Sequence, residues 1–226
     1  MLQRFQVLVV AALLAFSLPS AAADASALKP PAGAQVALVM FADLQDPECA
    51  RAYAVVSEAA TTHGIPLVLH DFPLPRHNWA FDAALWARYF DQTSTALGNE
   101  FRKFLYANQT QITHDNLQQW VQKFGDNNKA SVALSSDLND KLAGQVKADF
   151  SLGQRLGVEH SLTIWVVSNS GISQPLVDEV KDRAQLNQMI EDMQKKAQTE
   201  SPAKNVLPQS GTVPRKSAGK TMKKAG

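Results

Sequence analysis

Cysteine is almost absent from this chain of 226 residues, which contains only Cys49. A single thiol excludes an internal disulfide framework, a multi-cysteine zinc module and an iron–sulfur cluster held by the chain's own thiolates. Charged residues are also sparse, at 19% against 45% hydrophobic. This balance excludes a wholly disordered chain, a collagen-like chain and a coiled-coil rod, and it supplies enough apolar residues for a buried core.

The N-terminal apolar run is too short to span a bilayer comfortably, because it covers only residues 7–16. Arg4 places a positive charge before it, and a stretch of small residues precedes Asp24. This pattern is typical of a secretory signal peptide over residues 1–23. With such a signal peptide we expect a periplasmic or secreted protein. The alternative interpretation of residues 1–23 is an uncleaved membrane anchor.

Charge is unevenly distributed along the chain. The stretch 203–226 contains six basic residues and no acid, and residues 1–23 add one arginine. Since the whole chain has a formal net charge of +1, residues 24–202 carry a net charge of −6. The composition predicts that residues 201–226 form a disordered, solubilising basic tail. Contact of this tail with an anionic surface is the alternative. Aromatic residues do not alternate with the basic ones, so no nucleic-acid partner is expected.

The first half of the remaining chain predicts a β-α-β unit. Residues 35–41 and 66–72 are apolar and rich in strand-forming residues. Between them Asp46 is placed to cap a helix, which we expect to run to about Thr62 and to stop at Gly64. A helix of this length between two strands is typical of a right-handed crossover joining a parallel pair.

From residue 79 to about residue 156 the spacing of the apolar residues becomes helical. Gly98 and Gly125 are expected to be helix boundaries. The clearest amphipathic stripe in this block has four apolar residues at helical spacing: Leu117, Trp120, Val121 and Phe124. Strand character returns at residues 163–167, and a turn signal at 169–171 predicts a partner strand at 172–177. Apolar residues between Leu186 and Ala197 predict a closing helix.

Three segments in this order resemble the DsbA-like thioredoxin family. Residues 39–51 (VMFADLQDPECAR) are similar to its first strand and active-site turn, where a Phe-x-Asp-x-x step precedes Cys-Pro-x-Cys. Residues 71–74 (DFPL) are similar to its junction with the helical insert, and residues 156–163 (LGVEHSLT) to its Leu-Gly-Val-x-Gly-Thr-Pro-Thr segment. The resemblance covers residues 33–197.

This resemblance implies an α/β thioredoxin fold, β-α-β followed by β-β-α, with an inserted α-helical subdomain. We expect the domain to cover residues 24–200 and the insertion to cover about 78–157.

Two departures from the family pattern fall at the site that the resemblance implies. Asp46 stands at the position of the attacking thiolate, and a carboxylate cannot form a mixed disulfide. Leu162 stands at the position of the cis-proline. Because a cis bond before a non-proline residue costs about 3 kcal/mol, we expect this bond to be trans. Together the departures predict that dithiol–disulfide oxidoreductase activity has been lost.

The resemblance places the candidate site on two segments: Asp46, Pro47, Glu48 and Cys49, with His160, Ser161 and Leu162. We expect Cys49 to be a buried, inert thiol. The helix N-terminus lowers the pKa of this thiol and the neighbouring acids raise it, and the sequence does not decide which effect is larger. His77 is expected to cap the insertion or to bind backbone there.

A peptide- or protein-binding role at the former substrate groove is therefore the leading hypothesis, with no cofactor. Thiol–disulfide exchange through Cys49 alone is the enzymatic alternative. A periplasmic metal-binding protein is the second alternative, with Asp46, Cys49, His160 and Ser161 as conceivable ligands. The other histidines have no ligand spacing, so no metal is expected.

Overall fold

The protein is described by a computed structural model that covers residues 28–133, 135–173, 176–177 and 183–200. The predicted signal peptide and basic tail lie outside these residues. None of the helices in the described ranges is long and apolar enough to cross a membrane. The elements follow one another as β1 (Val36–Ala42), α1 (Pro47–His63), β2 (Leu67–Asp71), α2 (Ala80–Asp91), α3 (Thr95–Asn108), η2 (Gln109–Gln111), η3 (His114–Asn116), α4 (Leu117–Asn128), α5 (Ser136–Arg155), β3 (Thr163–Ser168), β4 (Gly171–Ile172), β5 (Leu176–Val177) and α6 (Arg183–Glu200).

One mixed sheet forms the centre of the fold, with strand order β2-β1-β3-β4 and with β5 also paired to β3. β1 and β2 are parallel, as the β-α-β prediction requires, and β1 and β3 are antiparallel. The partner strand predicted at 172–177 is confirmed at its two ends, where β4 and β5 pair antiparallel with β3. Between them the Ser173 hydroxyl and amide both bond to the backbone of Val166, so a side chain replaces one rung of the ladder.

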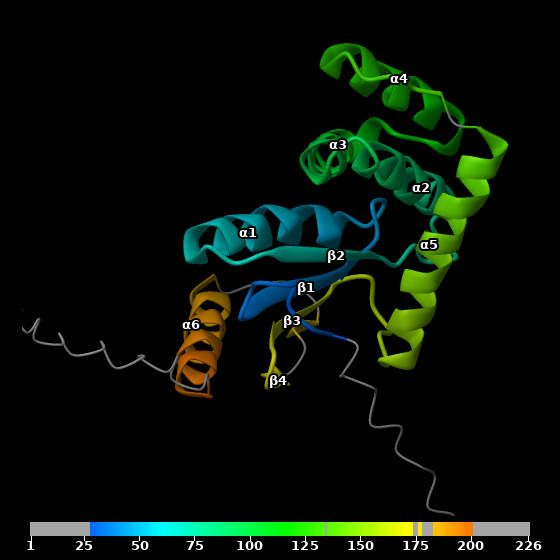
Figure 1. Cartoon of the computed structure of the whole chain (residues 1–226). Coiled ribbons are helices and arrows are strands. Elements are labelled where there is room, and N and C mark those ends of the chain that lie inside the picture. Colours follow the sequence, from blue (N-terminus) through cyan, green and yellow to red (C-terminus); the bar gives the residue numbers. More distant parts are fainter. Residues whose placement is uncertain (1–27, 134, 174–175, 178–182, 201–226) are drawn as a thin grey trace, which may run out of the picture.

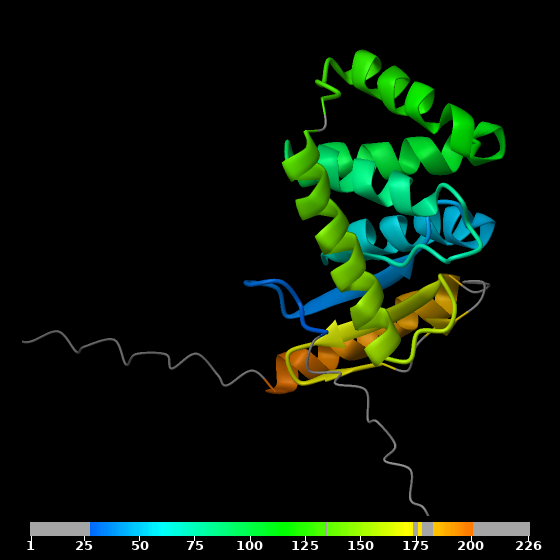
Figure 2. The ribbon, with the colours of Figure 1, turned by 90° about the vertical axis from the view of Figure 1, so that its right-hand side faces the viewer.

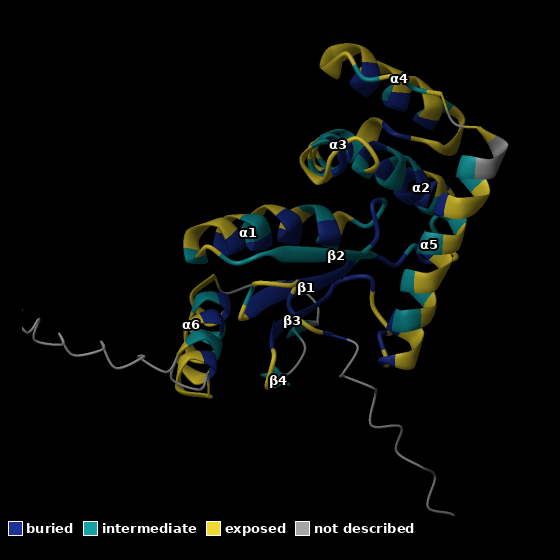
Figure 3. Cartoon of the chain, in the orientation of Figure 1, coloured by how far each residue is buried: buried dark blue, intermediate teal, exposed yellow. Residues whose placement is uncertain are grey.

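The two faces of the sheet are covered by different helices (Figure 1). Val36, Leu38 and Met40 belong to one core cluster with α1 and α6, and the alternate residues of β1 belong to a second cluster with part of α5. Side chains alternate along a strand, so burial on both faces explains why β1 is an unbroken apolar run. Figure 3 shows β1 buried between helices whose outer surfaces are exposed.

Helices α2 to α5 lie between β2 and β3 in the sequence and form the helical insertion. Figure 2 shows α4 stacked over α2 and α3, with α1 and the sheet below them and α5 running alongside. Their core is aromatic, with Phe90, Phe101 and Phe124 in mutual ring contact at centroid distances of 4.8 to 5.0 Å. The predicted stripe of α4 is confirmed for Leu117, Val121 and Phe124, which are buried.

Gly98 and Gly125 do not bound helices, contrary to prediction, because α3 and α4 continue through them. Their small size serves close packing instead. A Cβ at Gly98 would lie 1.8 Å from Oδ1 of Asp91, and one at Gly125 would lie 2.3 Å from Cγ2 of Val132. A glycine required for close approach has the same local sequence signature as one that ends a helix.

Two glycines of α5 provide a test of this packing. A Cβ at Gly153 would lie 2.6 Å from the Phe72 ring, whereas one at Gly144 would have nothing within 4 Å. We expect Gly153→Ala to lower the free energy of unfolding by about 1–3 kcal/mol through overpacking. Gly144→Ala, the matched control, should raise it by about 0.5–1 kcal/mol through helix propensity. Urea denaturation measures both, and equal effects would contradict the packing described.

Candidate functional site

The N-terminus of α1 is capped as the sequence predicts. Asp46 has extended backbone angles, φ −85° and ψ 121°, and its Oδ1 accepts a hydrogen bond of 2.9 Å from the amide of Glu48. Pro47 occupies the first turn, where a missing N–H costs nothing. At the other end Gly64 adopts the left-handed conformation, φ 63°, that terminates the helix. Both ends of this helix are confirmed.

A second loop, residues 160–162, meets this N-terminus. The hydroxyl of Ser161 donates to Oδ2 of Asp46, so the carboxylate joins the two loops. The Cys49 thiol lies 3.3 Å from the Ser161 carbonyl oxygen, to which it donates. Leu162 packs in the same core cluster as Cys49. No peptide bond among the described residues is cis, so the bond before Leu162 is trans, as expected.

The residues of the site differ in exposure. Cys49, Ser161 and Leu162 are buried, Asp46 and Glu48 are half-buried, and Pro47 and His160 are exposed. Glu48 forms an ion pair with Arg51, one turn along α1. The surface therefore presents an exposed proline and imidazole around a carboxylate that already has hydrogen-bond partners.

Burial determines the state of the only thiol. Cys49 is 0% exposed, and desolvation raises its pKa to about 12. The negative charges of Asp46 and Asp43 act in the same direction, and together these effects outweigh hydrogen bonds from the Asp43 amide and Ser161. The burial expected from the sequence is confirmed, and its effect on the pKa exceeds that of the neighbouring charges. The thiol is neutral at pH 7 and a poor nucleophile.

A buried carboxylate, Asp43, lies behind the site and was not among the predicted site residues. It is 1% exposed and accepts bonds of 2.7 Å from the amides of Gln45 and Leu74. Nδ1 of His77 also lies 2.7 Å from it, so His77 contacts a carboxylate rather than backbone, a correction to the prediction. Burial raises the pKa of Asp43 despite these bonds. The sequence signal was an acid directly after a buried strand.

The helical insertion also holds the loop that carries Asp43. The Tyr106 hydroxyl donates to the Asp43 carbonyl oxygen at 3.5 Å, and the Gln109 side chain donates to the Leu44 carbonyl oxygen at 2.9 Å. The Trp79 amide donates to the Gln45 side chain at 2.8 Å. The loop before α1 is therefore fixed from both sides, by the sheet and by the insertion.

The sequence matches the profile of a family described as thioredoxin over residues 31–206. The chain belongs to the thioredoxin family. Its fold is DsbA-like, as solved structures show. ScsC of Proteus mirabilis aligns with a TM-score of 0.58 and 17% identity, over 72% of this chain and 69% of that one. The thiol-disulfide exchange protein alpha-DsbA2 of Wolbachia pipientis aligns with a TM-score of 0.56 and 15% identity, over 73% and 85%.

A third structure is a periplasmic thioredoxin-like protein from Salmonella enterica serovar Typhimurium. It aligns with a TM-score of 0.54 and 14% identity, over 70% of this chain and 83% of that one. No match was found among curated protein sequences. At these identities the structural likeness establishes the shared fold, while the chemistry of this thioredoxin-family member depends on its own residues.

A second group of charged residues lies where β2 meets the helical insertion, and it was also missed. Arg88 of α2 donates to both Asp71 at the end of β2 and Asp149 of α5. His70 Nδ1 lies 2.8 Å from the Asp149 carboxylate. This cluster joins β2, α2 and α5, and its role is to orient the insertion on the sheet.

The structure does not assemble the ligand set considered for a metal. Within the described ranges, no three His, Cys, Asp or Glu side chains lie close enough together to hold a metal ion. His160 is exposed at the rim, whereas Cys49 is enclosed beneath Asp46 and Ser161. These residues meet as a hydrogen-bonded group rather than as open ligands.

The raised pKa of Cys49 predicts a thiol that resists alkylation. An unperturbed thiol has a pKa of about 8.5, so with a pKa near 12 the folded protein should react with iodoacetamide at pH 8 roughly a thousand times more slowly than the unfolded chain. The double variant Cys49→Ala, Ala54→Cys is the control, because Ala54 is exposed on the same helix. Mass spectrometry measures both rates, and rapid labelling of native Cys49 would contradict its burial.

Proposed function

We propose that this chain is an exported, noncatalytic DsbA-like protein that binds an extended peptide or protein segment at the former active-site surface. The observation that carries the proposal is the geometry at Asp46. At the position of the attacking thiolate stands a carboxylate that caps α1 and accepts the Ser161 hydroxyl. The remaining thiol is enclosed behind it.

Thiol–disulfide exchange requires an accessible thiolate to attack and a second thiol to release the mixed disulfide. Cys49 is 0% exposed, and its raised pKa keeps it protonated. With one cysteine in the chain, release would need a thiol from another molecule. This arrangement supports loss of dithiol chemistry and gives no support to exchange through Cys49 alone.

The surface that remains supports binding. Pro47 and His160 are exposed on the two loops that meet at Asp46. Both loops are held rigidly, by the helix cap on one side and the Ser161 bond on the other. A pre-organised surface binds with less loss of conformational entropy than a mobile one. The export signal expected in residues 1–23 and the periplasmic protein among the structural neighbours support a periplasmic or secreted location.

Restoring the missing sulfur tests the loss of activity. We expect the native chain to show no insulin reduction with dithiothreitol, because no exposed thiolate is available. In Asp46→Cys the introduced thiol occupies the site facing Cys49, and we expect a disulfide to form under oxidant. Free-thiol titration and mass spectrometry detect it. Insulin reduction by the native chain would overturn the proposal if the substitution Cys49→Ala abolished it. The Cys49→Ala variant also supplies the baseline rate.

Binding is tested separately with two exposed histidines. The probe is fluorescein-labelled ribonuclease A that has been reduced and carboxymethylated, which supplies unfolded segments without reactive thiols. We expect His160→Asp to weaken binding about tenfold, which corresponds to 1.4 kcal/mol. His114→Asp, an exposed histidine in η3 on the insertion, should leave it unchanged. Fluorescence anisotropy measures both, and equal affinities would remove the binding site from this surface.

A further inference from the structure

β2 forms one edge of the sheet, because it stands first in the strand order β2-β1-β3-β4 and has β1 as its one partner among the described strands. The Pro66 carbonyl oxygen accepts the Leu38 amide at 2.9 Å. At the other end the Phe72 amide donates to the Ala42 carbonyl oxygen at 2.8 Å. The even-numbered residues of this stretch therefore direct their backbone groups toward β1. Residues alternate along the ladder, so the backbone groups of residues 67, 69 and 71 point outward from the edge.

Part of this edge is closed by the protein itself. The Asp71 amide donates to Oδ2 of Asp149 at 3.0 Å, so α5 ends the free edge there. The backbone amides and carbonyl groups of Leu67 and Leu69 have no hydrogen-bond partner within the part of the chain that the structure describes. Both residues are half-buried. Two donors and two acceptors are thus available at the spacing of alternate residues in a strand, about 7 Å apart.

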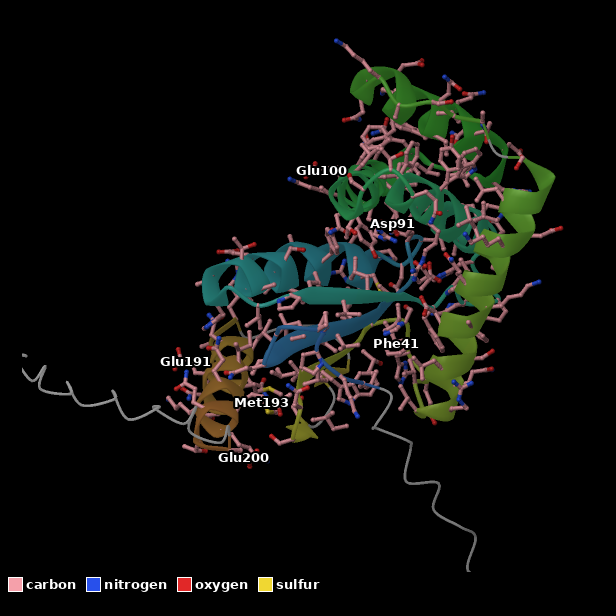
Figure 4. The ribbon with its side chains drawn as sticks, viewed as in Figure 1. Phe41, Asp91, Glu100, Glu191, Met193 and Glu200 are labelled. Carbon is pink, nitrogen blue, oxygen red and sulfur yellow. The ribbon has the colours of Figure 1, made fainter. Side chains whose placement is uncertain are left out.

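A groove of about 780 Å³ lies beside this edge, between α1 and α3. Leu67 lines the groove together with Tyr53 and Tyr106, whose rings lie 5.2 Å apart. Leu69 lines a smaller hollow that has the same two tyrosines in its wall. Figure 4 shows Glu100, which also lines the groove, projecting from α3 above α1. The free backbone groups and the aromatic pair therefore lie at one place, where β2 meets α1 and α3.

We propose that β2 accepts an extended segment of another protein as an added antiparallel strand, at a site separate from the former active-site surface. Residues directly opposite each other in an antiparallel pair direct their side chains to the same face. The two residues that bond to Leu67 and Leu69 therefore direct their side chains toward the tyrosines. In strand addition the main-chain bonds provide affinity, and pockets for alternate side chains provide specificity.

The lining defines the chemistry of this segment. Its two charged residues, Glu100 and Lys103, have opposite signs and lie three residues apart on α3, so the groove selects no net charge. Ala54 and Ala107 are exposed on the two helices, and their small side chains leave the space over the tyrosines open. The segment that fits is extended and carries uncharged apolar side chains at alternate positions.

A second copy of this chain fits the edge less well than an isolated segment. Two identical antiparallel strands are related by a twofold axis perpendicular to their sheet, so both copies would place their helices on the same face. A second α3 would then lie beside the first, next to the groove. An isolated segment brings only its own side chains to that face.

A backbone-modified peptide tests the pairing. The probe is a fluorescein-labelled peptide in which serine and valine alternate, with a lysine at each end for solubility. With valine in the groove, the valine amides face β2 and the serine amides face away. We expect N-methylation of the valines to weaken binding to the full chain about tenfold, because it removes the donors. N-methylation of the serines should leave the affinity unchanged. Fluorescence anisotropy measures all three peptides. Absence of binding by the parent peptide, or equal weakening by both modifications, would overturn the proposal.

Substitutions in the groove test its contribution. We expect Ala54→Arg to weaken binding of the parent peptide about tenfold, because the larger side chain fills the space over the tyrosines. Thr62→Arg is the control, because Thr62 is exposed on the same helix but does not line the groove. Equal affinities of the two variants would contradict the placement. His160→Asp should leave this affinity unchanged whatever its effect at the former active site, so the two proposals can fail separately.

Amide hydrogen exchange measured by NMR locates the added strand. With the peptide bound to nine-tenths of the chain, we expect the amides of Leu67 and Leu69 to exchange about tenfold more slowly. The Asp71 amide is the internal control, because it already donates to Asp149. Unchanged exchange at Leu67 and Leu69 would overturn the proposal. Protection of these amides in the peptide-free chain, together with a dimer in sedimentation analysis, would also overturn it, because the occupant would then be a second copy.

Discussion

The carboxylate of Asp46 connects two distant loops of the thioredoxin fold at the N-terminus of α1. One oxygen accepts the Glu48 amide and thereby starts α1, and the other accepts the Ser161 hydroxyl from a loop 115 residues away. A helix N-terminus stabilises a negative charge, whether thiolate or carboxylate. Aspartate therefore satisfies the electrostatic requirement of this position without supplying a thiol. The helix cap is retained, and Cys49 behind it is the only thiol in the sequence.

Behind this contact the insertion is fastened to the sheet by buried polar groups rather than by apolar packing alone. Asp43 receives the Leu74 amide and the His77 ring, both in the segment that leads from β2 into α2. Arg88 of α2 binds the acids Asp71 of β2 and Asp149 of α5. Buried polar groups of this kind are costly unless every partner is present, so they fix one orientation of the insertion on the sheet. The groove of about 780 Å³ between α1 and α3 depends on that orientation, because α1 belongs to the thioredoxin part and α3 to the insertion.

Features set by neighbouring residues could be predicted from the sequence. Strand periodicity and the Asp-Pro-Glu start predicted β1, α1 and β2. The proximity of Asp46 and Ser161 could be predicted only from the family resemblance, because the residues around a helix cap do not indicate which distant loop it will contact. The contact between Asp43 and His77 could not be predicted, because it depends on tertiary packing. For Cys49 the sequence predicted burial, but not that burial would dominate the pKa. Gly98 and Gly125 were misread because their function is packing across helices. The groove depends on the spacing between two helices, which no sequence pattern specifies.

The presence of a cysteine at position 49 needs no redox explanation. Its sulfur accepts the Asp43 amide at 3.4 Å and donates to the Ser161 carbonyl oxygen at 3.3 Å, in a space that is fully enclosed. Alanine would leave both backbone groups without this partner, and a buried unsatisfied amide costs about 1–3 kcal/mol. Serine has donor and acceptor capacity but shorter reach and a stronger demand for solvation. A neutral thiol, weakly polar and larger than a hydroxyl, suits a site that is mostly apolar and has one donor and one acceptor to satisfy. The same enclosure that raises the pKa of the thiol also holds its sulfur between these two backbone groups.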